Sequence, residues 1–369
     1  MLKRFEVTNF KNFRDTKIFD FGDVHDYHFN EECVKNKILN KAIIYGKNSV
    51  GKTNLGYALF DITFNFNNYA TEYSAYQDSY LNADSEQYVA QFKYVFQFED
   101  TEVIYEYQKH DINTLLYEKL VFNDKTVLEY SFVKEEMLVY DAEALSAQTL
   151  NWEFSNINMS VVKYIANNTF FDKDHPLLNL VTFVSRMVWF RALELNRYIG
   201  VLKKREGLTS FIINNELVDE FEKFLNVNGV DEKIIVKDNG EGNPELYFAH
   251  KQPISFSKTA SSGTRSLTAI FFWIKHIEDY SFIWIDEYDA FFHYEVSDNL
   301  IKVLRDYIDV QVVLTTHNTN IMSNRYMRPD CYFILSKHGL TSLCNATERE
   351  LREGHNLQKM YLSGEFDEE

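Results

Sequence analysis

An eight-residue phosphate-binding pattern constrains this chain more than any other feature of its sequence. Residues 46–53 read G-K-N-S-V-G-K-T and fit the pattern G-x-x-x-x-G-K-[ST]. Glycines let such a loop curl until successive backbone N–H groups hold phosphate oxygens, together with the start of the next helix. The lysine reaches the β- and γ-phosphates and the threonine binds Mg²⁺. We therefore expect ATP and Mg²⁺ at Gly46, Asn48, Ser49, Gly51, Lys52, Thr53 and the adjoining Asn54.

The residues around this loop give it the expected context. Residues 41–45 form a short apolar run before the loop, and residues 53–66 have a helical pattern after it. A strand, a glycine loop and a helix in that order begin a nucleotide-binding α/β fold. Further along, alternation predicts strands over 88–119 with a turn near 99–101. The apolar stretch 177–198 predicts a helix capped by Asp174.

A second motif combines a buried strand with two acids. Residues 282–285 are apolar and are followed by Asp286 and Glu287. Ligands of open α/β sheets bind at the carboxyl ends of the strands, so this strand would deliver both carboxylates to the phosphates. We expect Asp286 to hold Mg²⁺ with Thr53, and Glu287 to orient and polarise the attacking water. The pattern is weak alone and gains its meaning from the phosphate loop upstream.

Two further segments complete the set. Residues 259–267 place hydroxyl side chains and Gly263 at the start of a helix, which is a second anion site, although Ser262 acting as an ordinary helix cap explains the same pattern. Residues 312–317 form a buried strand that ends in His317. A histidine in this place can contact the γ-phosphate and report its presence, although a lone histidine after a strand is usually structural.

In this order the four motifs resemble those of the ABC ATPases of the SMC, RecF and OLD group. The resemblance covers about residues 1–66 and 215–340, including the opening F-E-V-T-N-F-K-N-F of residues 5–13. It implies an α/β fold: an ABC-type P-loop ATPase head with a mixed sheet and a mainly helical insertion. It also implies that Ser262 and Gly263 bind the γ-phosphate of a partner subunit's ATP, that Asp289 lies at the dimer interface, and that His317 is the switch histidine. Thr264 and Arg265 depart from the usual signature, which leaves the role of Arg265 open.

Within that group, the S-S-G-T form of the signature, the short chain and the ending of the sequence resemble compact ATPases of bacterial phage-defence operons, of the PARIS or abortive-infection type. The resemblance implies an ATP-hydrolysing sensor subunit that forms a nucleotide-sandwich dimer, or a multiple of it, and controls a separate effector chain such as a nuclease in response to a phage-derived trigger. We divide the chain into an N-terminal ATPase lobe (1–109), an insertion or lid (110–205), a lobe with the signature, acidic strand and histidine (206–345) and a tail (346–369).

Composition narrows the alternatives. The net charge of −17 excludes a basic surface over the whole protein, so binding of DNA would need a local patch. The short basic stretch 203–205 is more typical of a solvated turn. Three widely spaced cysteines and the lack of a long apolar stretch indicate a protein of the reducing cytoplasm with no membrane partner. A DNA-repair or chromosome-handling ATPase, and a nucleotide switch that barely turns over, remain as alternatives.

Overall fold

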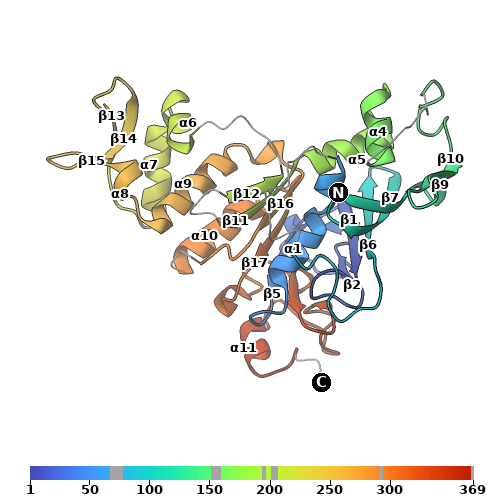
Figure 1. Ribbon diagram of the computed structural model, residues 1–369. Helices are drawn as coiled ribbons and strands as arrows, with labels where there is room; N and C mark the ends of the chain where they lie inside the picture. The colour runs from blue at the N-terminus through green and yellow to red at the C-terminus, as the bar shows by residue number, and fades with distance from the viewer. Residues whose placement is uncertain (67–77, 151–158, 193–196, 201–206, 291–293, 367–369) are drawn as a thin grey trace.

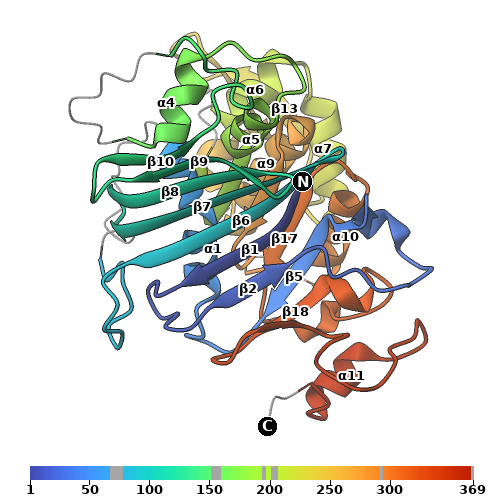
Figure 2. The same ribbon diagram turned by 90° about the vertical axis from the view of Figure 1, so that its right-hand side faces the viewer.

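Two seven-stranded sheets organise the residues that the computed structural model describes, which are 1–66, 78–150, 159–192, 197–200, 207–290 and 294–366. The first sheet is antiparallel throughout, with the strand order β10-β9-β8-β7-β6-β1-β2, and Figure 2 shows its strands side by side. Its strands are β1 (Leu2–Thr8), β2 (Lys17–Asp20), β6 (Ala90–Phe98), β7 (Thr101–Asp111), β8 (Thr114–Phe122), β9 (Lys125–Ser131) and β10 (Glu136–Tyr140). The predicted strand pair with a turn at 99–101 is therefore confirmed.

The second sheet is mixed and has the order β12-β11-β16-β17-β5-β18-β19. Its five central strands are parallel, and β12 and β19 pair antiparallel at the edges. The strands are β5 (Lys41–Tyr45), β11 (Met187–Ala192), β12 (Arg197–Gly200), β16 (Phe282–Ile285), β17 (Gln311–Thr315), β18 (Tyr332–Leu335) and β19 (Leu340–Ser342). Strands β5, β16 and β17 are buried along their whole length, as expected for parallel strands covered on both faces.

Helix α1 (Lys52–Phe60) lies between the two sheets. Toward the first sheet, the Tyr94 hydroxyl donates to the carbonyl oxygens of Ala58 and Leu59, at 2.9 and 3.2 Å. Toward the second sheet, a Cβ atom added at Gly56 would lie 2.9 Å from the Trp189 ring, so glycine permits the close approach of α1 to β11. The helix that begins at the phosphate loop is thus fixed on two sides.

Helices α9 (Ser262–Ile274) and α10 (Tyr294–Arg305) cover the other face of the second sheet. Side chains alternate along β11, so Trp189 faces α1 while Phe190 contacts Trp273 of α9, with ring centroids 4.6 Å apart. Ile283 and Ile285 of β16 face the same apolar layer together with Leu300 of α10. The mixed sheet is therefore enclosed by α1 on one face and by α9 and α10 on the other.

Smaller elements surround these layers (Figure 1). The remaining helices are α2 (Ile62–Phe66), α4 (Val161–Asn168), α5 (Pro176–Ser185), α6 (Leu208–Asn214), α7 (Val218–Val227), α8 (Phe256–Thr259) and α11 (Leu357–Leu362). The remaining strands are β3 (Val34–Lys35), β4 (Ile38–Leu39), β13 (Ile234–Asp238), β14 (Pro244–Phe248) and β15 (Ile254–Ser255). In the described ranges, none of the helices has the length and apolar character that crossing a bilayer requires.

The prediction that the range 110–205 is mainly helical is wrong for its described residues, because most of its regular structure is strand. Its helical part is α4 and α5, but the same range also holds strands that extend the first sheet and two strands of the second sheet. The helix predicted over 177–198 is wrong beyond Ser185, because residues 187–192 form β11, and residues 193–196 lie outside the described ranges. The cap of α5 is His175 rather than Asp174, since its side chain accepts from the Leu177 N–H. The four-part division of the chain stays a prediction.

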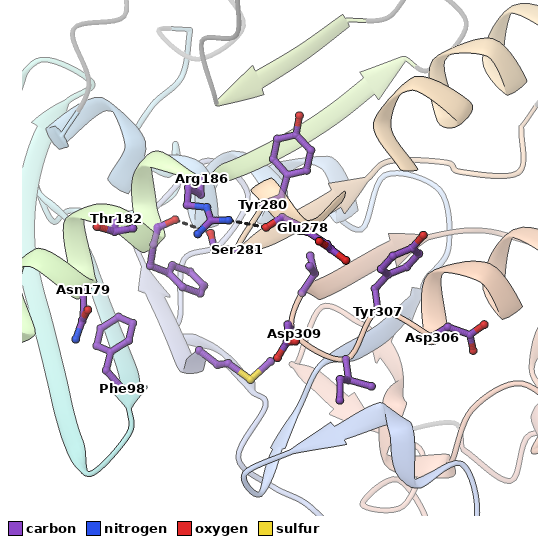
Figure 3. A pocket seen from close by; sticks show the side chains of 14 residues that line it. Phe98, Asn179, Thr182, Arg186, Glu278, Tyr280, Ser281, Asp306, Tyr307 and Asp309 are labelled. Carbon is purple, nitrogen blue, oxygen red and sulfur yellow. Dashed lines mark hydrogen bonds between the residues drawn. The ribbon is translucent and has the colours of Figure 1, made fainter. Parts of the chain in front are cut away.

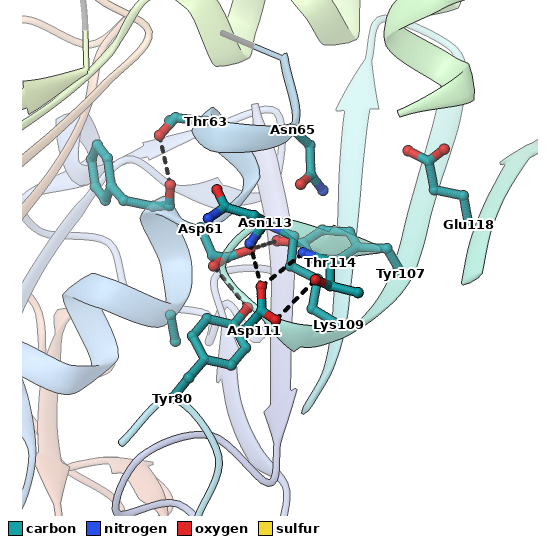
Figure 4. Close-up of polar contacts among 12 residues, drawn as sticks. Asp61, Thr63, Asn65, Tyr80, Tyr107, Lys109, Asp111, Asn113, Thr114 and Glu118 are labelled. Atoms are coloured by element: carbon teal, nitrogen blue, oxygen red, sulfur yellow. Dashed lines mark hydrogen bonds and ion pairs between the residues drawn. The ribbon is translucent and has the colours of Figure 1, made fainter. Parts of the chain in front are cut away.

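A buried polar cluster joins the end of α1 to the first sheet (Figure 4). Asp61 lies between α1 and α2 and is fully buried, and its carboxylate pairs with the Lys109 ammonium at 2.7 Å. The hydroxyls of Tyr80 and Tyr107 each donate to the same carboxylate at 2.9 Å. Tyr107 and Lys109 both belong to β7, and Tyr80 precedes β6 in the chain, so Asp61 fixes the far end of the phosphate-loop helix to the first sheet.

We expect Asp61→Asn to lower the free energy of unfolding by about 3–5 kcal/mol, because it leaves the buried Lys109 charge without its counterion. Thermal and denaturant unfolding of the purified protein measure this loss. Glu106→Gln is the matched control, since it makes the same change in the half-exposed pair of Lys93 and Glu106 and should cost less than about 1 kcal/mol. Equal losses in the two variants would contradict a special role for the buried pair.

Candidate active site

The phosphate loop has the curled backbone that its sequence predicts. Gly51 precedes α1 with a φ of 106°, and Ser49 also has a positive φ, of 65°. A Cβ atom at Gly46 would lie 2.8 Å from the Val50 side chain and 2.9 Å from the Leu335 carbonyl oxygen. Among the described residues, no side chain caps the first turn of α1. Its backbone N–H groups therefore form an anion site of the expected kind at the helix start.

Lys52 is the cation of this site. Only 7% of the residue is exposed, and its ammonium donates to the Gly46 carbonyl oxygen at 2.8 Å. The same Nζ lies 2.9 Å from Nε2 of His317, so the structure brings these two predicted residues together across 265 positions of sequence. Burial lowers the pKa of Lys52, while the nearby carboxylates of Asp286 and Glu287 act in the opposite direction.

Thr53 and Asp286 also meet. The Thr53 hydroxyl donates to Oδ2 of Asp286 at 2.7 Å, and the Thr315 hydroxyl donates to Oδ1 at 2.6 Å. A hydroxyl and a carboxylate are oxygen ligands of the kind that Mg²⁺ prefers. Among the described residues no three His, Cys, Asp or Glu side chains form a metal cage, so such an ion would take its other ligands from phosphate and water. The donor set fits the predicted metal residues.

Glu287 is placed differently from Asp286. Asp286 is 9% exposed, whereas Glu287 is exposed and has a left-handed backbone with a φ of 45°. Its N–H donates to the Thr315 hydroxyl at 2.8 Å, which fixes the turn after β16. Within the described ranges the Glu287 carboxylate has no hydrogen bond or ion pair. One acid is thus engaged beside the phosphate loop, and the other is available to a water molecule.

The loop after β17 is tied to the loop after β16. The Thr316 hydroxyl donates to both carboxylate oxygens of Asp289 at 2.8 Å. The His317 side chain itself is exposed apart from its contact with Lys52. The residues predicted from the acidic and histidine motifs therefore occupy one edge of the sheet with the phosphate loop.

The signature segment lies elsewhere in the chain. Ser261, rather than Ser262, caps α9, because its side chain accepts from the Thr264 N–H at 3.1 Å. The Arg265 guanidinium donates to the Ala260 carbonyl oxygen and to the Ser262 hydroxyl, at 2.7 and 3.3 Å. Figure 1 shows the start of α9 beside α8, well apart from β5 and α1. The structure does not bring Ser262 and Gly263 to the phosphate loop of their own chain.

Two contributors to the site were not predicted. Thr315 bridges β16 and β17 through its hydroxyl. It belongs to the T-T-H pattern, in which only the histidine was assigned a role from the sequence. Asn12, in the opening motif, donates to the Val50 carbonyl oxygen at 2.8 Å and accepts from the Asn54 side chain at 2.7 Å. Asn12 thus fastens the phosphate loop to the turn after β1.

We expect Gly51→Ala to weaken ATP binding strongly, because the new Cβ would lie 2.5 Å from the Asn12 side chain in a left-handed backbone. Gly229→Ala is the control, since Gly229 has a φ of 83° but nothing within 4 Å of the added Cβ. Both variants should lose about 1–2 kcal/mol of stability from backbone strain. Only Gly51→Ala should change the dissociation constant measured by nucleotide titration, and an equal affinity in both would contradict the loop geometry.

A separate cavity of about 590 Å³ lies at the opposite edge of the second sheet (Figure 3). Ser281 and Val310, which line it, immediately precede β16 and β17. The Arg186 guanidinium at its wall donates to the carbonyl oxygens of Glu278 and Asp279, at 2.5 and 2.6 Å. None of the motif residues lines this cavity, so it is distinct from the nucleotide site.

Comparisons with known proteins agree with this geometry. The solved SMC head bound to the C-winged helix domain of ScpA has 13% sequence identity to this chain and a TM-score of 0.50. The match covers 86% of this chain and 89% of the SMC head chain. An Smc head domain with an extended coiled coil, bound to the C-terminal domain of ScpA and derived from Pyrococcus furiosus, is 11% identical, covers 93% and 96%, and also has a TM-score of 0.50. These likenesses show that the chain has the fold of Smc head domains, which agrees with the predicted fold class.

Sequence comparisons add the family. A search of curated proteins gives no match. A family model described as "AAA domain, putative AbiEii toxin, Type IV TA system" matches residues 41–323, which include the phosphate loop, the acidic strand and the histidine. Since the match spans most of the chain, the protein belongs to this family of AAA ATPase domains.

Proposed function

We propose that this protein hydrolyses ATP and uses the nucleotide to control a separate effector in a bacterial anti-phage defence system. The observation that carries the ATPase part is the convergence of Lys52, Thr53, Asp286 and His317 at one edge of the sheet, with distances of 2.7 Å from Thr53 to Asp286 and 2.9 Å from Lys52 to His317. The family description and the ATPase-head fold support the same reaction.

Each residue has a distinct part in the proposed reaction. The α1 start and Lys52 bind the β- and γ-phosphates, and Thr53 and Asp286 would hold Mg²⁺, which neutralises phosphate charge when bound. Glu287 orients a water molecule and accepts its proton as the water attacks the γ-phosphorus. The bond to the bridging oxygen of ADP breaks, and inorganic phosphate leaves. His317 contacts the γ-phosphate and links its presence to the loop that holds Asp289.

The regulatory part rests on the family and on what the chain contains. The family description names an abortive-infection toxin and a toxin–antitoxin system, which supports a defence role. The longest described helix, α9, has 13 residues, so the described ranges hold no long coiled coil like that of the Smc head structure. We propose a protein of the cytoplasm that closes on ATP as a dimer and releases its effector on infection.

The test is a phage challenge of bacteria that carry this gene together with its genomic neighbours. We expect protection against some phages, and we expect Lys52→Ala to abolish it because nucleotide binding is lost. Glu106→Gln, far from the nucleotide site, should retain protection at equal protein levels. Plating efficiency measures the effect.

A specific outcome would favour the DNA-repair alternative instead. Equal plaquing with and without the operon across a broad panel, together with tight DNA binding by the purified protein, would contradict the defence role. The basic stretch 203–205 lies outside the described residues, so it adds no structural argument for a DNA surface. ATP hydrolysis by the purified protein would be common to both functions, and its absence would instead favour a nucleotide switch.

A further inference from the structure

Arg191 lies at the end of a strand that carries none of the recognised motifs but ends beside them. Strand β11 is parallel to β16, with Phe190 opposite Ile285, and the Asp286 N–H donates to the Phe190 carbonyl oxygen at 2.9 Å. Arg191 is the next residue of β11. Its backbone is therefore adjacent to that of Asp286, whose carboxylate accepts from Thr53.

The Arg191 side chain is directed toward the phosphate-loop helix. Its guanidinium carbon lies 4.9 Å from the centroid of the Tyr57 ring and 5.7 Å from that of Trp189. Alternation along the strand agrees, because Trp189 and Arg191 share a face and Trp189 packs on α1. Tyr57 follows Thr53 by about one turn of helix. The guanidinium is thus placed on the phosphate-loop side of the sheet, near the first turn of α1.

Two aromatic rings hold this guanidinium while its N–H groups stay available. In the described part of the chain, the Arg191 side chain has no ion pair or hydrogen bond, although its backbone lies beside that of Asp286. Asp286 instead accepts from two threonine hydroxyls. A guanidinium that is stacked on rings loses little freedom when it binds, and its planar N–H groups match the oxygens of a phosphate.

Three neighbouring parallel strands therefore end at one edge with complementary groups. Strand β16 delivers the two acids, and β17 on one side of it delivers His317. Strand β11 on the other side delivers Arg191. We propose that Arg191 binds the γ-phosphate of ATP held by its own chain, on the side opposite His317. This inference rests on the proposed ATPase function and adds a residue that distinguishes ATP from ADP.

Nucleotide titration of the full chain tests the inference. We expect Arg191→Met, which keeps an unbranched stem over the rings but removes the charge, to weaken binding of a non-hydrolysable ATP analogue by about tenfold to hundredfold, the range of a hydrogen bond between charged groups. ADP affinity should stay nearly unchanged. Arg191→Lys should recover part of the ATP preference because it restores the charge without the planar fork.

Arg325→Met is the matched control, since its guanidinium also lies over a tyrosine ring, 5.5 Å from the centroid of Tyr326, and it should keep the wild-type preference. Circular dichroism and thermal unfolding establish that each variant is folded; if Arg191→Met is not, Arg191→Gln gives the same comparison. If a folded variant without the Arg191 charge keeps the wild-type preference for ATP, the proposed role of Arg191 is overturned but the proposed ATPase function is not. Failure of the wild-type chain to bind ATP would instead overturn the proposed function.

Discussion

Glu287→Gln should leave ATP binding intact and reduce the hydrolysis rate by about 10²–10⁴-fold, the usual contribution of a positioned general base. The reason is the division of labour between the two acids after β16. Asp286 is buried and engaged by two threonine hydroxyls, whereas the Glu287 carboxylate is exposed at the strand end. Only Glu287 is free to accept a proton from water. Steady-state phosphate release and nucleotide titration measure the two effects separately.

Two variants show whether this loss belongs to the position of Glu287. Glu278→Gln makes the same change at the opposite edge of the sheet, beside the separate cavity, and should hydrolyse ATP at the wild-type rate. Asp286→Asn, unlike Glu287→Gln, should weaken Mg²⁺-dependent nucleotide binding itself, because it removes a magnesium ligand. Wild-type turnover by Glu287→Gln would show that another group activates the water.

Local patterns were sufficient to predict the motif-bearing strands. The predicted strands at 41–45 and 282–285 coincide with β5 and β16, and the loop between β5 and α1 has positive φ angles at Ser49 and Gly51. These segments are short, wholly apolar and bounded by motif residues, so length and context agree. A sequence signal of this kind needs no knowledge of distant partners.

Periodicity could not resolve the segment that forms β11. A continuous apolar run is compatible with a buried helix or a buried parallel strand, and only its neighbours decide. Here Met187 pairs with Phe282 across 95 positions, and Trp189 fills the space left by Gly56 on α1. This pairing also places Arg191 beside Asp286, so the error in secondary structure hid a residue of the candidate site.

Contacts between motifs were predictable only in part. The sequence indicated that Thr53 and Asp286 would meet, because both belong to magnesium-binding patterns, and the structure places them 2.7 Å apart. It gave no such signal for Asn12, which acts through the backbone of the phosphate loop rather than through a ligand. Residues that support a site through hydrogen bonds carry no pattern of their own, and the folded structure is needed to find them.

Chains that carry Lys52→Ala and chains that carry Ser262→Arg, each inactive alone, should regain ATPase activity when they are mixed. The reason is that the start of α9 lies apart from the phosphate loop of its own chain, although its sequence predicts a second anion site there. We propose that this site completes the nucleotide site of a partner chain. A mixed two-fold dimer then combines one intact phosphate loop with one intact signature.

The size of the recovery is also defined. With random exchange, half of the dimers are mixed and each has one intact site of two, so roughly a quarter of the wild-type rate is expected if the sites act independently. The matched control mixes Lys52→Ala with the double variant Lys52→Ala and Ser262→Arg, which leaves no intact phosphate loop and should stay inactive. Mixed dimers that form, as subunit exchange of differently tagged chains would reveal, but remain inactive would contradict a shared site. If only the first mixture recovers activity, Ser262 acts on the ATP bound by the partner chain. A site made from residues of a single chain could not be restored by mixing two inactive chains.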